Sequence, residues 1–484
     1  MSILSRVTDF LLYGFGADMS DMEFLEKAIT RWKGSPERMT QVKGFLYYDG
    51  EHDILRRRRT MIGDNGELQE VSNLPNNLVV DNQYAKLVNQ KVNYLFGQPF
   101  SFETENEQYT DALKGVFDRR FMRVIKRSGN YAYNGGTAWL YPYYDEHGDF
   151  RFRLFPGYEI LPFWADAEHE RLDGAVRLYT VKGYENKQEK TVQKVEVYDA
   201  AGIHCYVLDG AHLMPDLSAK EQDCAYVLAN GQPLNWERIP LIPLRVNSAG
   251  QPLIKKVKSL QDSINVMISD FENNMQEDAR NTILVLKNYD GTDLGEFRRN
   301  LATFGAVKVR YDDSQKGGVE TLEIQVNADN YKAILEIFKK AIIENAMGYD
   351  AKDDRLSGNP NQMNIQSMYS DIDLDANDAE TEYQAAFDEI LWFVNAHLAN
   401  TGRGNYGGEE VNIIFNRDIL INESEVIENC AKSQGLISDE TIVSMHPWVD
   451  DPQRELDRIA EQRQRETELY NPFEPQDSGE GDDE

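Results

Sequence analysis

The chain has 484 residues, and 41% of them are hydrophobic, including 6 Trp, 25 Tyr and 21 Phe. This composition predicts about two to four compact units with real cores and excludes a chain that is disordered throughout. With 51 Lys and Arg against 82 Asp and Glu, the net charge is −31, which argues against a protein that holds nucleic acid by neutralising phosphates. No apolar run approaches the roughly 18 residues that span a bilayer, so no membrane partner is expected.

The first part of the chain is predicted to be mainly helical. Helical spacing indicates short helices over Asp21–Lys33 and Pro36–Tyr48, separated by a Gly-Ser-Pro turn. An amphipathic helix is expected over Asp81–Phe96 and another over Glu107–Tyr133. Four consecutive arginines, Arg56–Arg59, lie between Tyr48 and Asp81; they could contact phosphates or a partner but are more simply a solvated or intersubunit charge patch.

The middle of the chain changes to a period of two, which is typical of strands. A β-hairpin is predicted on either side of the turn at Asp145–Asp149, because large apolar residues alternate before and after it. More strands are expected, and together they predict an antiparallel meander: Ala175–Val181, Lys194–Asp199 and Ile203–Leu208. The polar stretch 213–232 is predicted to be a loop. Pro240 and Pro243 bracket a short extended segment after it.

Two long amphipathic helices are predicted next, on either side of a β-rich insertion. Apolar residues recur every three or four positions in both, at Val257, Leu260, Ile264, Met267 and Phe271 in the first, and at Tyr331, Ile334, Phe338, Ala341 and Ile342, followed by Asn345, in the second. Such stripes could close a hairpin within one subunit or line a seam between subunits. The insertion holds strand-like runs at Thr282–Lys287, Ala306–Tyr311 and Glu320–Val326 and a small helix at Leu294–Ala302.

A strongly acidic region follows, from Asp350 to Glu382, in which Lys352 and Arg355 are the basic side chains. Its aspartates mimic a calcium-binding loop, but the position that needs glycine holds Ala376 in a helix-forming stretch. The region is either a solvated helix face or, in a ring, the negatively charged lining of a passage. Helices are then expected over Glu423–Gly435, Ser438–Ser444 and Arg454–Leu469 before an acidic, disordered end.

No catalytic signature accompanies these elements. The chain contains no phosphate-binding loop, no zinc-protease motif and no hydrolase elbow, and its histidines lack metal-ligand spacing. We therefore expect no enzyme, no catalytic residue, no metal ligand and no cofactor. The alternative is a metal-dependent enzyme acting on DNA or sugar nucleotides through Asp371, Asp373 and Asp375.

Several short strings point to a family when taken together and in order. They are Tyr47–Ile54, Asn77–Asn82, Tyr94–Phe100, Ser357–Ile365, Ile414–Asp418 and Gly435–Thr441. Each string alone is weak, but their order and spacing resemble the portal proteins of long-tailed bacteriophages, and most closely the SPP1-type portal family.

The resemblance implies an α+β, multidomain portal fold that assembles as a dodecameric ring at one capsid vertex, where double-stranded DNA is packaged and ejected. It divides the chain into a wing (1–253, with the spine helix and strand of 363–416), two stem helices (254–280 and 326–347), a small α/β clip (281–325), a tunnel loop (348–362), an α-helical crown (417–470) and a disordered tail (471–484). The expected location is the virion, and the host cytoplasm during assembly.

The same resemblance suggests partners and site residues. The partners would be the terminase large subunit, the scaffolding protein, the major capsid protein and the head–tail connector protein, besides DNA and further copies of the chain. Tunnel-loop contacts with DNA are expected from Lys352, Arg355 and Asn359. The acidic channel lining is expected from Asp371, Asp373, Asp375 and Asp378. Docking of partners on the clip is expected from Arg298, Arg299, Lys308 and Arg310.

Overall fold

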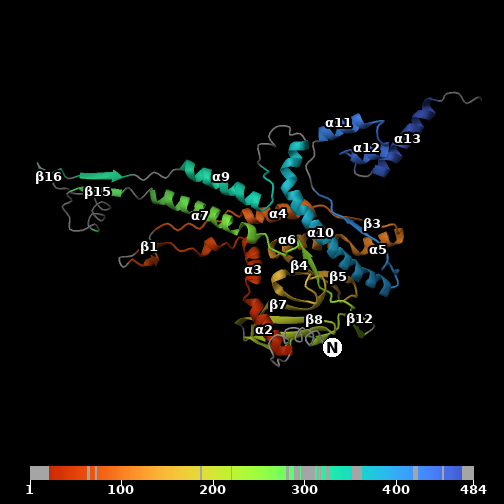
Figure 1. Ribbon diagram of the computed structural model, residues 1–484, viewed down its shortest axis with the longest axis horizontal. Helices are drawn as coiled ribbons and strands as arrows, with labels where there is room; N and C mark the ends of the chain where they lie inside the picture. The colour runs from red at the N-terminus through yellow and green to blue at the C-terminus, as the bar shows by residue number, and fades with distance from the viewer. Residues whose placement is uncertain are drawn as a thin grey trace, which may run out of the picture. The chain divides into compact units, whose positions relative to one another are not determined.

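The structure is a computed structural model of the chain (Figure 1). It describes residues 21–62, 66–70, 74–185, 188–219, 221–229, 231–278, 283–287, 295, 311–312, 315–316, 318–322, 328–351, 362–417, 423–449 and 452–470. These residues form a mixed α+β fold with several antiparallel sheets. Among the described helices, none combines the length and apolar character that crossing a membrane requires.

The chain divides into two compact units. The first unit consists of Met1–Gly348 and Asp371–Asp418, and the second consists of Tyr349–Ser370 and Ile419–Glu484. The long helix α10 (Gln362–Asn400) contributes to both.

The helices of the first unit follow the predicted spacing closely. They are α2 (Asp21–Lys33), α3 (Pro36–Tyr48), α4 (Gln83–Phe96), α5 (Glu107–Val116), α6 (Arg119–Gly135), α7 (Ile254–Asp278) and α9 (Ala328–Asn345), with short 3₁₀ turns η1 (Asp53–Arg56) and η2 (Gly157–Glu159). The prediction of one helix over Glu107–Tyr133 was wrong. The chain breaks at Phe117, and Asp118 caps a new helix by accepting hydrogen bonds from the backbone N–H of Arg120 and Phe121 at 2.8 and 2.9 Å.

The predicted meander is confirmed as an antiparallel sheet with the strand order β10-β9-β8-β7-β6. Its strands are β6 (Ile160–Trp164), β7 (Leu172–Glu185), β8 (Gln188–Asp199), β9 (Gly202–Asp209) and β10 (His212–Pro215), and β11 (Asp223–Cys224) pairs with β9. The prediction that 213–232 is a loop was wrong in part, since β12 (Val227–Ala229) also lies there and pairs with β13 (Gln232–Leu234). The buried side chain of Leu213 anchors β10 in the core that α2 shares with this sheet. The strand was missed because a single apolar residue does not produce the alternating pattern by which strands are predicted.

The predicted hairpin is also confirmed, as β4 (Thr137–Tyr144) paired with β5 (Phe150–Pro156). The strand β14 (Ile242–Arg245) joins the other side of β4. Pro243 is tolerated there because β14 is an edge strand of this three-stranded sheet. On the outer side of an edge strand no neighbouring strand needs the backbone N–H that proline lacks.

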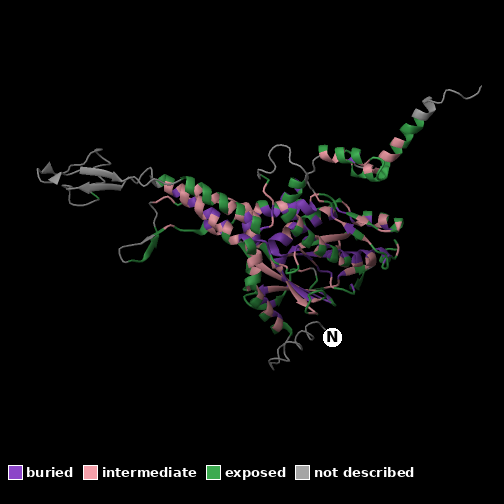
Figure 2. Cartoon of the chain, turned by 45° about the horizontal axis from the view of Figure 1, so that its top comes forward, coloured by how far each residue is buried: buried purple, intermediate pink, exposed green. Residues whose placement is uncertain are grey.

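An aromatic cluster joins α10 to the rest of the first unit. Phe100 lies 5.0 Å from Phe387 and 5.9 Å from Phe415, centroid to centroid, and Phe121 packs 4.7 Å from Phe117. The strand β19 (Asn412–Ile414), within the range 363–416 predicted to hold a spine helix and a strand, returns from α10 to pair with β3 (Ser101–Glu103). The C-terminal half of α10 is therefore buried on the side that faces this cluster, within the body of the first unit, where Figure 2 shows most of the buried residues.

The helices α7 and α9 run side by side as a pair (Figure 1). The rings of Phe271 and Tyr331 meet at 5.0 Å between them. Beyond the pair, β15 (Ile283–Lys287) pairs with β18 (Gly318–Leu322), and β16 (Tyr311–Asp312) pairs with β17 (Gln315–Lys316). A separate hairpin, β1 (Thr60–Ile62) with β2 (Leu68–Glu70), follows the arginine cluster.

The second unit contains three predicted helices, which are confirmed within a few residues: α11 (Glu423–Ser433), α12 (Asp439–Met445) and α13 (Pro452–Tyr470). Ser438 caps α12 by accepting a hydrogen bond from the backbone N–H of Thr441 at 3.3 Å. In the same unit the rings of Tyr349 and Tyr369 pack at 4.6 Å.

Candidate functional site: the paired helices and the polar contacts at their base

The most buried line of α7 is polar, which the sequence reasoning missed. Val257 and Ile264 of the predicted apolar stripe are buried, but Leu260, Met267 and Phe271 are only half-buried. Four polar side chains spaced four residues apart are at most 3% exposed: Gln261, Asn265, Ser269 and Asn273. Since buried polar groups are costly unless they are hydrogen-bonded, this line must have a partner.

The partner is the segment that precedes α4. The backbone N–H groups of Asn77, Val79 and Asp81 donate to the side-chain oxygens of Asn273, Ser269 and Asn265 at 2.7, 3.0 and 3.0 Å. The N–H of Tyr84 donates to Gln261 Oε1 at 2.9 Å, and Gln261 Nε2 donates to the carbonyl of Asp81 at 2.8 Å. We call this set of contacts the polar ladder.

The spacing of the polar ladder has a simple geometric basis. Four residues of an α-helix advance about 6.0 Å, whereas two residues of extended chain advance about 6.6–6.8 Å. Every fourth side chain of α7 therefore keeps step with every second backbone N–H of the segment 77–81, which runs antiparallel to it. The ladder fixes the register of α7, and the string Asn77–Asn82 quoted above is one of its two sides.

His52 contacts the polar ladder at Asn265. It is 1% exposed, its Nε2 lies 2.9 Å from the carbonyl of Tyr47, and its Nδ1 lies 2.7 Å from Asn265 Nδ2. Nε2 donates to the carbonyl and Nδ1 accepts from the amide, so the ring is neutral. Burial lowers the pKa of His52 below its usual value, in agreement with that assignment.

Ion pairs join both long helices to the part of the chain between α3 and α4. Lys339 on α9 lies 2.7 Å from Asp81, whose backbone is part of the polar ladder. Lys258 on α7 lies 2.8 Å from Asp53 and 2.6 Å from Asp262. The ion pairs therefore anchor α9 to the segment before α4 and α7 to η1, in addition to the apolar contact between the two helices.

A buried ion pair lies where α4, α6, α9 and α10 meet. Lys91 is 1% exposed, and its Nζ is 2.8 Å from Asp375 and 3.0 Å from the carbonyl of Met347, just beyond the end of α9. Tyr133 donates its hydroxyl to the same carboxylate at 2.8 Å. Burial lowers the pKa of Lys91 and raises that of Tyr133. Lys91 thus holds the C-terminal end of α9 against α10.

A second ionic contact fastens the strand after α10 back onto that helix. Arg417 pairs with Asp373 and with Glu380, the latter at 2.6 Å, and Tyr94 donates its hydroxyl to Asp373 at 2.7 Å. Beside it, Asn416 donates to the carbonyl of Pro99 at 2.7 Å. These contacts give the string Ile414–Asp418 a structural role.

The prediction of one exposed acidic face therefore has to be narrowed. Asp371 and Asp378 are exposed, but Asp375 is buried against Lys91 and Asp373 is paired with Arg417. Two carboxylates already paired with cations do not form the metal site of the alternative enzyme hypothesis. In the part of the chain that the structure describes, no group of His, Cys, Asp and Glu side chains gathers as metal ligands would.

Three of the four arginines that follow α3 form ion pairs or hydrogen bonds within the subunit. Arg57 lies 2.8 Å from Asp270 on α7, Arg58 lies 2.9 Å from Glu70, and Arg59 donates to the carbonyl of Pro75 at 2.6 Å. These contacts favour the interpretation as a charge patch within or between subunits over a free phosphate-binding surface.

Several predicted site residues lie outside the described residues. These are Lys352, Arg355 and Asn359 of the predicted tunnel loop, and Arg298, Arg299, Lys308 and Arg310 of the predicted insertion. The predicted small helix at Leu294–Ala302, except for residue 295, and the acidic end 471–484 also lie outside the described residues. They stay predictions.

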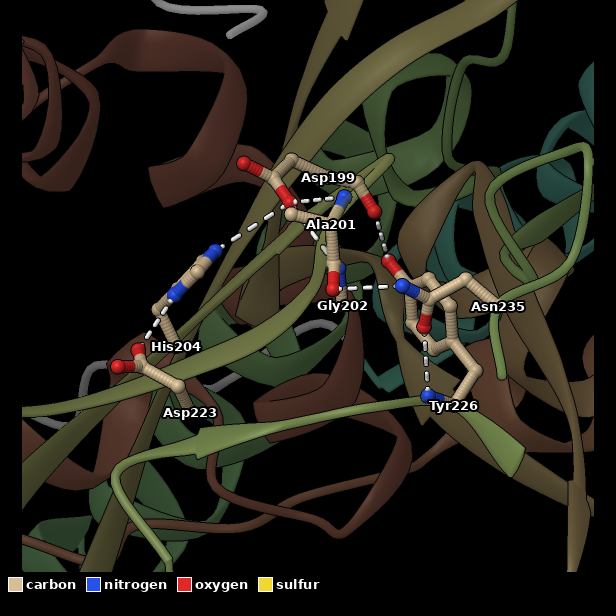
Figure 3. A network of polar contacts seen from close by, with 7 residues as sticks. All are labelled: Asp199, Ala201, Gly202, His204, Asp223, Tyr226 and Asn235. Carbon is tan, nitrogen blue, oxygen red and sulfur yellow. Dashed lines mark hydrogen bonds and ion pairs between the residues drawn. The ribbon is translucent and has the colours of Figure 1, made fainter. Parts of the chain in front are cut away.

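A separate polar cluster holds the turn between β8 and β9 (Figure 3). His204 lies 3.3 Å from Asp199 and 2.6 Å from Asp223, and hydrogen bonds to these carboxylates raise the pKa of His204 to about 9. Asp199 also accepts the backbone N–H of Ala201 at 2.7 Å, and its carbonyl accepts the hydroxyl of Tyr226 at 2.6 Å. These contacts join β8, β9 and β11 at this end of the sheet.

The chain matches a family model described as "Phage portal protein, SPP1 Gp6-like" over residues 34–469. It is 29% identical over 467 residues to the portal protein of Bacillus phage SPP1, an alignment that covers 96% of this chain and 90% of that protein. It is 25% identical over 451 residues to the portal protein of Clostridium phage phiCD119, covering 89% and 94% of the two chains.

Proposed function

The chain belongs to the SPP1 Gp6-like family of phage portal proteins, a structural and non-enzymatic class, and we propose how its parts serve the DNA channel of the capsid vertex. As a member of this family it is a component of the virion at the vertex through which DNA is packaged. The observation that carries this conclusion is the match over residues 34–469, which spans both compact units.

We propose a closed ring of twelve copies in which the paired helices α7 and α9 form the stem. In the same proposal, 1–253 with 363–416 form the wing, 281–325 the clip, 348–362 the tunnel loop and 417–470 the crown. The polar ladder supports this assignment because it fixes the register of α7 on the body of the subunit. A stem that carries load from a packaging motor needs a fixed base, and the hydrogen bonds between Gln261 and Asn273 of α7 and the segment before α4 supply one.

The tunnel loop is the proposed contact with moving DNA. Its basic side chains, Lys352 and Arg355, would touch phosphates transiently, with Asn359 beside them. The chain enters the loop directly after Met347, whose carbonyl Lys91 holds while pairing with Asp375 on α10, so the loop starts from a fixed support. Asp371 and Asp378 are the exposed carboxylates proposed to line the passage and to keep DNA from adhering.

The clip is the proposed docking surface for the terminase large subunit and later the head–tail connector protein, through Arg298, Arg299, Lys308 and Arg310. Rim charges of this kind act mainly on association rate and salt dependence. The scaffolding protein and the major capsid protein are the partners proposed for the rest of the ring.

Replacing Lys352 and Arg355 by Ala tests the tunnel-loop proposal. We expect rings and subunit melting to be unchanged, while DNA retention and packaged length fall, because the phosphate contacts are lost. The matched control replaces Arg31 and Arg171, two exposed arginines of the first unit, by Ala. If the tunnel-loop variant packages and retains a full genome like its control, the loop makes no functional contact with DNA.

A further inference from the structure

One face of α6 is basic and forms no ion pair among the residues that the structure describes. Five side chains on it are exposed: Arg119, Arg120, Arg123, Lys126 and Arg127. Arg127 lies over the ring of Tyr131 at 5.0 Å, but in the described part of the chain none of the five pairs with a carboxylate. The helix contains no Asp or Glu at all, in a chain whose net charge is −31. We call these five residues the basic face.

The basic face borders a small apolar hollow. A cavity of about 160 Å³ lies between α6 and the chain after α4, with Arg123 and Lys126 at its edge and Phe96, Phe100 and Met122 in its wall. A face that only keeps the protein soluble needs no such hollow beside it. Charge next to an apolar recess is typical of an interaction surface.

A groove of opposite charge lies along α10. Its volume is about 900 Å³, and its lining includes four exposed carboxylates: Glu237, Asp388, Glu409 and Glu410. Asn106 donates to Glu409 at 3.2 Å, and no ion pair joins the four to a cation among the described residues. The wall also contains Trp236, which is 8% exposed and whose indole N–H finds no acceptor in the described structure. We call this the acidic groove.

The two surfaces lie on opposite sides of one helix pair. The helices α6 and α10 pack through Phe121 against Phe387 and through a 2.9 Å hydrogen bond between the hydroxyls of Ser128 and Tyr383. At about 100° per residue, the basic face is centred opposite Phe121 on α6. By the same count, Asp388 and Trp392 of the acidic groove lie on the side of α10 turned away from α6. A subunit with complementary surfaces on opposite sides can join a head-to-tail ring.

We propose that the basic face of one copy docks on the acidic groove of the next copy around the ring. This inference rests on the proposed ring and names a contact that closes it. A second copy is favoured over DNA as the occupant because the chain itself carries both complementary surfaces, whereas DNA would account for the basic face and leave the groove empty. Charge complementarity of this kind fixes register and rejects wrong partners.

The test is a charge-swap experiment on the full chain. Arg119→Glu with Arg123→Glu should leave the purified protein folded but monomeric, since like charges would face each other, and should raise the concentration for half-assembly by roughly tenfold or more. Folding should survive because both positions are exposed, and because an acidic residue at position 119, in the first turn of α6, is favoured by the helix dipole. Asp388→Arg with Glu410→Arg should have the same effect, and combining all four substitutions should restore rings.

Native mass spectrometry and sedimentation would measure assembly, and circular dichroism would verify that each variant is folded. The matched control is Arg31→Glu with Arg171→Glu, which changes the net charge equally at exposed positions outside both surfaces. Rings that form normally from either reversed variant would overturn the proposal, as would an intact ring that has only lost affinity for DNA. A wild-type chain that forms no ring would instead refute the proposed function itself.

Discussion

Breaking the buried ion pair between Lys91 and Asp375 should destabilise the first unit strongly. Asp375→Asn leaves the Lys91 ammonium buried without a counter-charge, and Lys91→Met leaves the carboxylate in the same position. Removing one partner of a buried pair costs about 3–5 kcal/mol, so each single variant should lose that much of the free energy of unfolding. With an m-value of about 6 kcal/mol/M in guanidinium chloride, the unfolding midpoint should fall by about 0.5–0.8 M.

Removing the whole cluster is the decisive companion experiment. Lys91→Met, Asp375→Leu and Tyr133→Phe together leave no buried charge and no orphaned hydroxyl. Replacing a buried pair by apolar groups of similar size is often close to neutral, so the triple variant should lie within about 2 kcal/mol of the wild type. Equilibrium unfolding of dilute, unassembled protein would measure all variants. Single variants within 1 kcal/mol of the wild type, or a triple variant as unstable as the summed singles, would refute the reasoning.

Three further outcomes are expected. Asn265→Ala should cost about 2–4 kcal/mol of unfolding free energy, because a backbone N–H and a ring nitrogen both lose their partner, whereas Ser263→Ala on the same helix should cost almost nothing; equal effects would argue against the polar ladder. The pKa of His204 is raised in the folded state to about 9, so its ion pairs stabilise the fold fully below pH 6.5, and this stabilisation is lost as the pH rises to 9. His204→Gln should therefore remove the fall in melting temperature between these pH values. An unchanged dependence of the melting temperature on pH would contradict the prediction. Arg298→Glu with Arg299→Glu should leave rings intact but slow connector binding and packaging, and normal rates for both would remove the clip proposal.

The helices and the meander could be predicted because their apolar periods are long and regular. The helix α4 is an example, since Tyr84, Leu87, Val88, Val92 and Leu95 mark its buried side at helical spacing and all are buried. The break between α5 and α6 was missed because a single capping aspartate is a weak signal within a sequence whose helical spacing continues on both sides of it. Asp118 could have indicated it, since an Asp before two arginines is a favourable helix start.

The polar contacts at the base of the long helices were harder to predict, because their partners are distant in sequence. Gln261 and Asn265 sit four residues apart, which is a visible pattern, but nothing local reveals that Asn77–Asn82 lies against them. The position of Lys91 on the buried side of α4 carried a signal, since a lysine among Leu87, Val88 and Val92 needs a counter-charge. That the counter-charge is Asp375, and not an exposed lining residue, depends on tertiary structure alone.

The central claim is that copies of this chain close into a ring around a channel. Electron microscopy of the purified full-length protein tests it most directly. We predict closed rings with a central opening wide enough for duplex DNA, with the paired helices α7 and α9 of each copy around the opening. Particles that remain single subunits or compact dimers at every concentration and salt, with no opening, would contradict the account.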